Sequence, residues 1–191
     1  IGSTSHASDF CYMTSHDKLN VEITNYSREF YAKRGNYIQT GGLEVARKGD
    51  DDRMLELIRK VGSGKAFGTN AYMISAAEAK EKFPLLEEDQ IQGAMWDPDA
   101  GLVTPRSQKV AGDLVDEAVA SGKLKAFAYT PATKLIVEDG VIKGVETHKG
   151  TITADYVVLC VGIWGNLVSQ TAGVKLPLMP LEHPLLFFGP W

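Results

Sequence analysis

The segment 154–165, with the sequence ADYVVLCVGIWG, decides the fold class. Its centre, residues 156–161, is apolar at nearly every position, which predicts a strand covered on both faces. The strand pattern ends at Gly162, and a glycine there lets a ligand approach the backbone closely. Ligands of open α/β sheets bind at the carboxyl ends of such strands. We therefore expect a binding site around residues 162–165.

The elements that precede this segment favour a nucleotide-binding domain. Residues 104–122 predict a helix, with Thr104 as N-cap and Pro105 at the first helical position. Beyond it, β-rich runs separated by Asp-Gly and Lys-Gly turns predict a β-meander over residues 134–161. A helix, a meander and a buried strand ending in glycine form the back half of a doubly wound domain, so the expected fold class is α/β.

The first hundred residues predict further helices and strands. An amphipathic helix is expected over 17–34, capped by Ser15 or Asp17. Its apolar face consists of Leu19, Ile23, Tyr26 and Phe30. A second helix is expected over 50–61, and the capping-box pattern at Ser75 opens a short third one. Strands are expected at 37–39, 43–45 and 91–96.

Two short motifs in this part have a structural and a functional reading. The segment 62–65, GSGK, follows a helix rather than a strand, so it does not predict a phosphate-binding loop and is expected to be an ordinary loop. The acidic run 50–52 is similar to a metal-binding sequence, but it is better explained by the N-terminus of the second helix.

Composition excludes several classes of function. With 24 acidic and 20 basic residues the net charge is −4, which gives no basic surface for nucleic acid or anionic lipid. No apolar run approaches the length of a membrane span. Two cysteines form neither a disulfide framework nor a zinc motif, so no metal is expected. The beginning of the chain lacks an initiator Met and a signal-peptide pattern, and we expect it to lie inside a longer protein.

Seven segments together resemble the FAD-dependent D-amino-acid-oxidase superfamily, most closely its dimethylglycine oxidase, dimethylglycine dehydrogenase and sarcosine dehydrogenase branch. They occur in family order and cover nearly the whole chain: GSTSHA at 2–7, GGLEVA at 41–46, PLL at 84–86, WDPDAGLVTP at 96–105, GVIKGVET at 140–147, residues 154–165, and PLMPLEH at 177–183. The resemblance implies an incomplete doubly wound FAD-binding domain with a β-meander at 1–36 and 104–173. It also implies part of a mixed-sheet substrate domain at 37–103 and 174–191.

The resemblance also implies roles for particular residues. In this branch the histidine of the first segment carries the flavin covalently, which assigns that role to His6; a neutral imidazole is a suitable nucleophile. His183 is implied as a catalytic residue. The other implied cofactor-binding residues are Ser3, Thr4, Ser5, Ala132, Cys160, Gly162, Trp164 and Gly165.

For some of these residues a structural reading stays open. His6 is also compatible with a polar loop residue, Trp164 with a core aromatic, and Cys160 with a small buried thiol. Arg106 could face a substrate carboxylate or be a solvated residue of a first helical turn.

Two departures from the family pattern bear on function. The flavin-binding Gly-x-Gly-x-x-Gly motif is absent from the chain, and the tyrosine that often follows the family's histidine is replaced here by Pro184 and Leu185.

Three functions are therefore considered. The first is part of a flavin-dependent amine oxidoreductase that oxidises dimethylglycine or sarcosine by hydride transfer to FAD. The resemblance then implies a longer chain, whose other parts complete the domains and include a tetrahydrofolate site. It also implies an electron-transfer flavoprotein as the partner that accepts the electrons. The implied location is the cytoplasm in bacteria and the mitochondrial matrix in eukaryotes. The second is a non-catalytic folded fragment that binds no cofactor, and the third is a Rossmann-like module for another nucleotide.

Overall fold

The chain folds into two compact units. The computed structural model describes residues 2–182, 184 and 186. We call Ala7–Asp113 the core unit, and we call the segment up to His6 together with the residues from Leu114 onward the meander unit. The chain thus passes from one unit to the other after His6 and again after Asp113. The predicted boundaries of an incomplete FAD-binding domain and of part of a substrate domain stay a prediction.

The core unit holds two three-stranded antiparallel sheets, with strand orders β3-β5-β4 and β1-β6-β2. Its strands are β1 (Phe10–Cys11), β2 (Tyr37–Gln39), β3 (Gly42–Arg47), β4 (Tyr72–Ile74), β5 (Ile91–Asp97) and β6 (Gly101–Val103). Its helices are α1 (Lys18–Lys33), α2 (Asp51–Ala66), α3 (Ala76–Lys82), the 3-10 turn η2 (Glu88–Gln90) and the first half of α4 (Ser107–Ala120). The strands expected at 37–39, 43–45 and 91–96 are confirmed.

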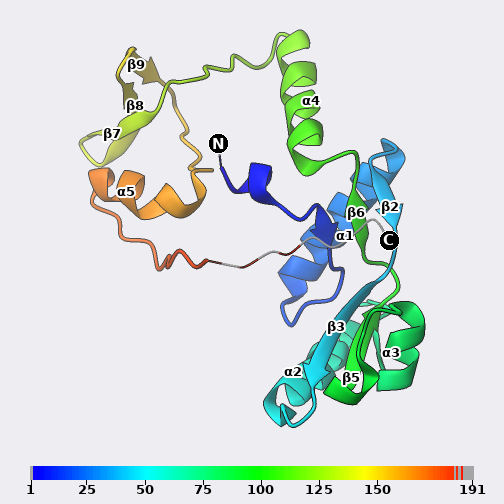
Figure 1. Ribbon diagram of the computed structural model, residues 1–191. Coiled ribbons are helices and arrows are strands. Elements are labelled where there is room, and N and C mark those ends of the chain that lie inside the picture. Colours follow the sequence, from blue (N-terminus) through cyan, green and yellow to red (C-terminus); the bar gives the residue numbers. More distant parts are fainter. Residues whose placement is uncertain (1, 183, 185, 187–191) are drawn as a thin grey trace. The chain divides into compact units, whose positions relative to one another are not determined.

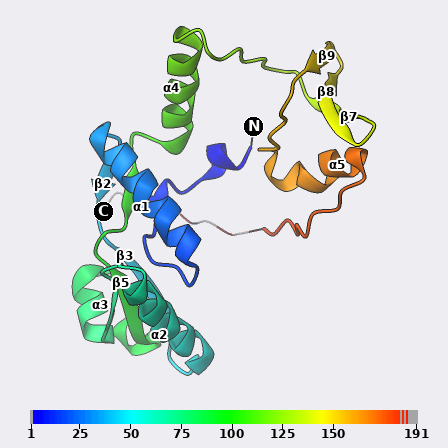
Figure 2. The same ribbon diagram turned by 180° about the vertical axis from the view of Figure 1, so that it is seen from behind.

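Helices α2 and α3 cover opposite faces of the β3-β5-β4 sheet (Figures 1 and 2). Side chains alternate between the faces of a strand, and the packing follows that alternation. Met95 packs with Leu57 and Val61 of α2, whereas its neighbour Ala94 packs with Ala79 of α3. The α2 side also contains Ala46 and Ala71, and the α3 side contains Ile74 and Ile91.

The predicted helix caps of α1, α2 and α3 are confirmed. The side chain of Asp17 accepts a hydrogen bond from the backbone N–H of Asn20 at the start of α1. Asp50 does the same for Arg53 N–H at the start of α2, so the acidic run caps this helix. In the described part of the chain no group of three or more potential metal ligands gathers. Ser75 and Glu78 form the expected capping box.

The prediction that residues 62–65 form a loop is wrong. These residues are the last turns of α2, which ends at Ala66. Gly64 is buried against Thr69 and Thr14, and a Cβ at position 64 would lie 2.4 Å from Thr69 Oγ1. The glycine therefore serves a close tertiary approach inside a helix, which the local sequence does not reveal.

The prediction that Thr104 caps the next helix is also wrong. Helix α4 begins at Ser107, and the Ser107 N–H donates to the carboxylate of Asp9, 2.7 Å away. A side chain distant in sequence thus replaces the local cap, because β1 lies beside β6 just before the helix begins.

The meander unit contains one antiparallel sheet of order β7-β8-β9 and a short helical stretch. The strands are β7 (Ala132–Glu138), β8 (Val141–Thr147) and β9 (Gly150–Thr153). The helical segments are η1 (Ser3–His6), η3 (Gly162–Trp164), α5 (Gly165–Ser169) and η4 (Gln170–Ala172). The expected meander with its Asp-Gly and Lys-Gly turns is confirmed up to residue 153.

The fully buried strand expected at 156–161 is absent from the described structure. These residues have no regular secondary structure, and Tyr156 and Val158 are 89% and 81% exposed. Cys160 is exposed as well, so its reading as a buried thiol is wrong. A strand that is apolar on both faces needs neighbours on both edges and both faces, and no described strand pairs with this segment.

The apolar faces of α1 and α4 are less covered than their patterns predict. On α1, Leu19, Ile23 and Tyr26 are exposed, and Val21 is the buried side chain. On α4, Val110 is buried. Periodicity gives the apolar face of a helix, but a partner surface is needed to bury it. Among the described residues, no helix is both long and apolar enough to cross a bilayer.

Candidate functional site

The meander unit contains a cavity of about 720 Å³. Three segments that are far apart in the sequence line it: the N-terminal turn, the start of β7, and the stretch from Cys160 into α5. The lining residues are Gly2, Ser3, Thr4, Pro131, Ala132, Thr133, Cys160, Val161, Gly162, Trp164, Leu167 and Val168. Hydroxyl groups from two of these segments and apolar side chains from the third therefore border one space.

Local hydrogen bonds hold the walls of this cavity. Ser5 closes the N-terminal turn, because its backbone N–H and its hydroxyl both donate to Gly2 O, at 3.1 and 2.8 Å. The Lys149 ammonium donates to Ala128 O and to Thr130 Oγ1, which fixes the loop that leads to Pro131.

The helical wall is tied to the sheet. The Thr171 hydroxyl of η4 accepts a hydrogen bond from the Leu135 N–H of β7 at 2.9 Å. Asn166 of α5 donates to Leu178 O and accepts from Leu176 N–H, which holds the following segment against the helix. The cavity is therefore built from elements connected within one unit.

Gly162 stands where the predicted strand was expected to end. Its φ is +54°, in the left-handed region that a side chain rarely adopts, and no atom lies within 4 Å of the position a Cβ would take. A glycine permits this backbone turn and leaves the cavity side open for a ligand. The chain then continues directly into the 3-10 turn that carries Trp164.

The structure brings most of the predicted cofactor-binding residues together. Ser3, Thr4, Ala132, Cys160, Gly162 and Trp164 all line the cavity. The reading of Trp164 as a core aromatic is wrong, because its side chain is half exposed at the cavity wall.

The remaining predicted residues lie elsewhere. Ser5 and His6 belong to the same N-terminal turn, but their side chains do not line the cavity. Gly165 is buried, and a Cβ there would lie 2.6 Å from Leu178 Cδ1, so it serves packing in α5. His183 lies outside the described residues.

The sequence reasoning missed three apolar residues of the helical wall, Val161 before Gly162 and then Leu167 and Val168. Leu167 and Val168 follow Trp164 by three and four positions, so helical spacing after the glycine could have revealed them. Pro131 and Thr133, which flank the predicted Ala132, were also missed.

Arg106 is not one of the residues that line the cavity. It belongs to the core unit, where its Nε donates to the Asp9 carboxylate at 3.1 Å, and its side chain is 57% exposed. This ion pair lies at the start of α4, so we assign Arg106 to holding the Asp9 carboxylate that caps this helix.

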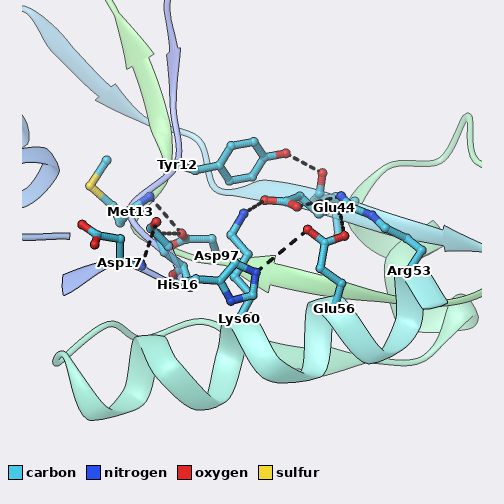
Figure 3. Close-up of polar contacts among 12 residues, drawn as sticks. Tyr12, Met13, His16, Asp17, Glu44, Arg53, Glu56, Lys60 and Asp97 are labelled. Atoms are coloured by element: carbon cyan, nitrogen blue, oxygen red, sulfur yellow. Dashed lines mark hydrogen bonds and ion pairs between the residues drawn. The ribbon is translucent and has the colours of Figure 1, made fainter. Parts of the chain in front are cut away.

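A second polar cluster lies in the core unit, between α2 and β3 (Figure 3). Glu44 occupies the face of β3 that α2 covers, and its carboxylate binds both Lys60 and Arg53. Arg53 also pairs with Glu56, whose other oxygen lies 3.9 Å from His16 Nε2. Glu44 pairs with Lys60 and Arg53, and Arg53 pairs in turn with Glu56, so we assign this cluster to holding α2 on the sheet.

Tyr12 borders the same cluster. Its hydroxyl donates to Leu43 O at 2.7 Å, and the Lys60 ammonium lies 5.4 Å from its ring centroid. Burial, with the negative charges of Glu44 and Asp97, raises the pKa of Tyr12 to about 12. The phenol is therefore a hydrogen-bond donor that fastens the segment after β1 to β3.

Asp97 anchors the following residues in the same way. Its fully buried carboxylate accepts a hydrogen bond from the backbone N–H of Met13 at 3.0 Å (Figure 3). It also accepts from the backbone N–H groups of Thr14 at 2.9 Å and of Asp99 at 3.2 Å. Backbone donors can satisfy a buried carboxylate, which makes this a structural anchor.

Comparison with known proteins gives the relatives of the chain. It is 31% identical to human mitochondrial sarcosine dehydrogenase over 195 residues, which is 95% of this chain and 21% of that protein. It is 28% identical to the mouse mitochondrial pyruvate dehydrogenase phosphatase regulatory subunit, covering 100% of this chain and 22% of that one. The chain thus spans about a fifth of the length of these relatives.

The fold of the chain is also similar to solved structures. L-proline dehydrogenase from P. horikoshii superimposes with a TM-score of 0.78 at 28% identity, over 91% of this chain and 46% of that one. The mixed α/β structure with antiparallel sheets is consistent with a partial domain of that fold, as expected.

The family model described as "DAO: FAD dependent oxidoreductase" matches residues 2–191. The match covers both the cavity in the meander unit and the whole of the core unit. The expected resemblance is confirmed, and the chain belongs to the FAD-dependent oxidoreductase family.

Proposed function

We propose that this chain is part of an FAD-dependent amine oxidoreductase that oxidises an N-methylated glycine such as sarcosine or dimethylglycine. The observation that carries the proposal is the cavity of the meander unit. Six residues assigned to the cofactor from the family resemblance come from three distant segments and line that one space. The similarity to sarcosine dehydrogenase supports the choice of substrate class.

The cavity fits a flavin nucleotide in size and chemistry. Its volume of about 720 Å³ lies within the range of cofactor pockets, roughly 300–1,000 Å³. Trp164 and Leu167 offer an aromatic face and an aliphatic surface, while the hydroxyls of Ser3 and Thr4 can hydrogen-bond a ribityl or phosphate oxygen. A mixture of ring-binding and hydroxyl groups suits a nucleotide.

In this proposal the residues of the chain bind the flavin, orient it and shield it from water. When bound, FAD supplies the acceptor for a hydride from the amine. Trp164 lines the cavity and would shield that side of a bound flavin from water, and Gly162 permits close approach to the backbone. His6, at the end of the N-terminal turn, is the proposed point of covalent attachment. His183 keeps its predicted catalytic role as part of this proposal.

The remaining features of the proposed enzyme concern the whole protein. Tetrahydrofolate would accept the one-carbon unit of the oxidised amine, and an electron-transfer flavoprotein would take the electrons. Two relatives are mitochondrial by name, which supports the mitochondrial matrix if the protein is eukaryotic.

A second candidate function is a non-catalytic member of the same family. The similarity to a phosphatase regulatory subunit over the full chain favours it. A regulatory protein could keep the fold and even the cavity without oxidising an amine, so flavin content and turnover separate the two candidates.

The test combines a spectrum, a mass and an assay of the full-length protein. We expect a visible flavin spectrum, a flavin that stays with the protein after acid denaturation, and reduction of that flavin by sarcosine or dimethylglycine under anaerobic conditions. His6→Ala should release the flavin on denaturation, whereas the matched variant His148→Ala, in the exposed β8–β9 turn, should retain it. A protein that holds flavin but is not reduced by any N-methylated glycine would favour the regulatory candidate, and one without flavin would refute the proposal.

A further inference from the structure

Thr171 connects two walls of the cavity in the meander unit. Its hydroxyl accepts a hydrogen bond from the Leu135 N–H at 2.9 Å and donates one to Val168 O at 2.6 Å. Leu135 belongs to β7, and the first two residues of this strand line the cavity, as Val168 does from α5. A hydroxyl has one hydrogen and two lone pairs, so it can make both bonds at once. A side chain outside the lining therefore joins the strand wall to the helical wall.

On the strand side, this bond lies at an open edge of the sheet. β7 is an edge strand, because the strand order is β7-β8-β9 and no other described strand pairs with it. Leu135 is paired with Val145 of β8 and is 5% exposed. The N–H of a buried residue needs an acceptor. The Thr171 hydroxyl supplies it in place of a neighbouring strand.

On the helix side, the bond holds an element that is too short to be stable by itself. α5 has five residues, and a helix of that length has few internal hydrogen bonds. The last carbonyls of a helix lack partners within it, and Val168 O accepts from the Thr171 hydroxyl. The position of α5 against the sheet therefore depends on bonds to its surroundings.

Two other hydrogen-bonding groups near the cavity act within a single wall. Ser5 closes the N-terminal turn on Gly2, and Lys149 holds the loop that leads to Pro131. Thr171 differs from both, because its two partners belong to β7 and α5, which line the cavity from different segments.

We propose that Thr171 is a positioning residue for the flavin cavity. Its hydroxyl fixes the distance between the α5 wall and the β7 wall, so that both contact the cofactor together. Thr171 is not among the lining residues and acts through the two walls. This inference rests on the proposed function, since it requires that the cavity holds FAD.

The test uses the full-length protein with His6→Ala, so that FAD binds reversibly and its affinity can be measured. Titration followed by flavin fluorescence gives the Kd, and thermal denaturation without FAD gives the Tm. Thr171→Val keeps the shape of the side chain and removes the hydroxyl. At a temperature where the protein is fully folded, it should raise the Kd about three- to tenfold, as expected for one lost neutral hydrogen bond.

Two further variants are controls. Thr171→Ser keeps the hydroxyl and should restore the starting Kd. Ser121→Ala removes a hydroxyl with the same kind of bonds in the same unit, since Ser121 donates to Ala118 O at 2.7 Å and accepts from Lys123 N–H at 3.4 Å. Ser121 lies outside the cavity lining, so this variant should leave the Kd unchanged.

The outcomes separate this inference from the proposed function. A lower Tm with an unchanged Kd in Thr171→Val would show a merely structural role and overturn the inference. A raised Kd that Thr171→Ser does not restore would overturn it as well, because the hydroxyl would not be the cause. A full-length protein that binds no FAD would refute the proposed function, and the inference with it.

If Thr171→Val does not fold, amide hydrogen exchange of the protein with Thr171 in place decides the question. A ligand that binds the two walls in their bonded positions stabilises the bond between them. FAD should therefore slow exchange of the Leu135 amide, measured by mass spectrometry, and leave the exposed strand β9 (Gly150–Thr153) unchanged. Equal exchange at Leu135 with and without FAD would overturn the inference.

Discussion

The core unit and the meander unit differ in where their apolar side chains lie. In the described part of the chain, the buried hydrophobic residues all belong to the core unit except Leu135. There, α2 and α3 enclose the β3-β5-β4 sheet from both sides. The meander unit has most of its large apolar side chains exposed, as at Tyr156, Val158 and Leu167, and it contains the open cavity.

This difference shows that apolar residues serve two purposes in this chain. Around the β3-β5-β4 sheet of the core unit, α2 and α3 cover the apolar residues, so burial there is achieved within the unit. In the meander unit, part of the apolar surface lines a space large enough for a ligand. We therefore expect substitutions in the core unit to change stability, and substitutions at the cavity to change cofactor binding.

The largest effect should come from Leu57→Ala. Leu57 is fully buried between α2 and the sheet, and such truncations cost about 2–5 kcal/mol of unfolding free energy. Leu55→Ala, on the exposed side of the same helix, is the matched control and should cost far less. Urea denaturation measures both, and equal losses would contradict a closed core.

Gly64→Ala should be next in size. The new Cβ would lie 2.4 Å from Thr69 Oγ1 and 2.7 Å from Thr14 Cγ2, and overpacking of this kind costs about 1–3 kcal/mol. Gly62→Ala, in the same helix with open space around it, should instead stabilise by about 0.5–1 kcal/mol. Opposite signs in denaturation experiments would confirm the close approach, while two stabilising substitutions would contradict it.

Trp164→Ala should separate binding from stability in the meander unit. Loss of the indole from the cavity wall should weaken non-covalent FAD binding about tenfold, equivalent to roughly 1.4 kcal/mol. The unfolding free energy should change little, because the side chain is half exposed. Tyr156→Ala, exposed in the same unit and outside the cavity lining, should leave the affinity unchanged. Fluorescence titration with FAD distinguishes the two, and equal affinities would contradict the assigned site.

The smallest effect concerns Asp9, at the connection between the two units. Its folded pKa is lowered from an ordinary value of 3.8, so its stabilising contribution is complete above that value and is lost as the pH falls through the folded pKa. The contribution at neutral pH should be about 1 kcal/mol, typical of a helix cap. Denaturation of wild type and Asp9→Asn between pH 6 and 2 should give a difference that shrinks toward acid, and a constant difference would argue against an ionised cap.

Local sequence signals succeeded wherever the deciding contacts are local. The Asp17 and Asp50 caps, the Ser75 capping box and the Asp139-Gly140 turn all depend on neighbours a few residues away, and all were predicted. The cavity was predicted in part, because the family resemblance gave residues on each of its three walls.

The failures share the opposite cause. Helix α2 includes residues 62–65, where Gly64 is needed for the close approach of Thr69 and Thr14, and α4 begins at Ser107, where Asp9 supplies its cap. The segment 156–161 is apolar enough for a central strand, but no described strand pairs with it. In each case the deciding partner is distant in sequence or lies on another element.

The sequence by itself determined the elements with local caps and turns, the α/β class and the family, because short-range hydrogen bonds and ordered motifs are written in neighbouring residues. Only the tertiary structure decided which apolar faces are buried, which glycine is required by packing, and that Ser3, Ala132 and Trp164 border one cavity. Burial and cavity formation depend on surfaces brought together from distant segments. A residue pattern specifies which side chains a surface presents, but not which other surface packs against it.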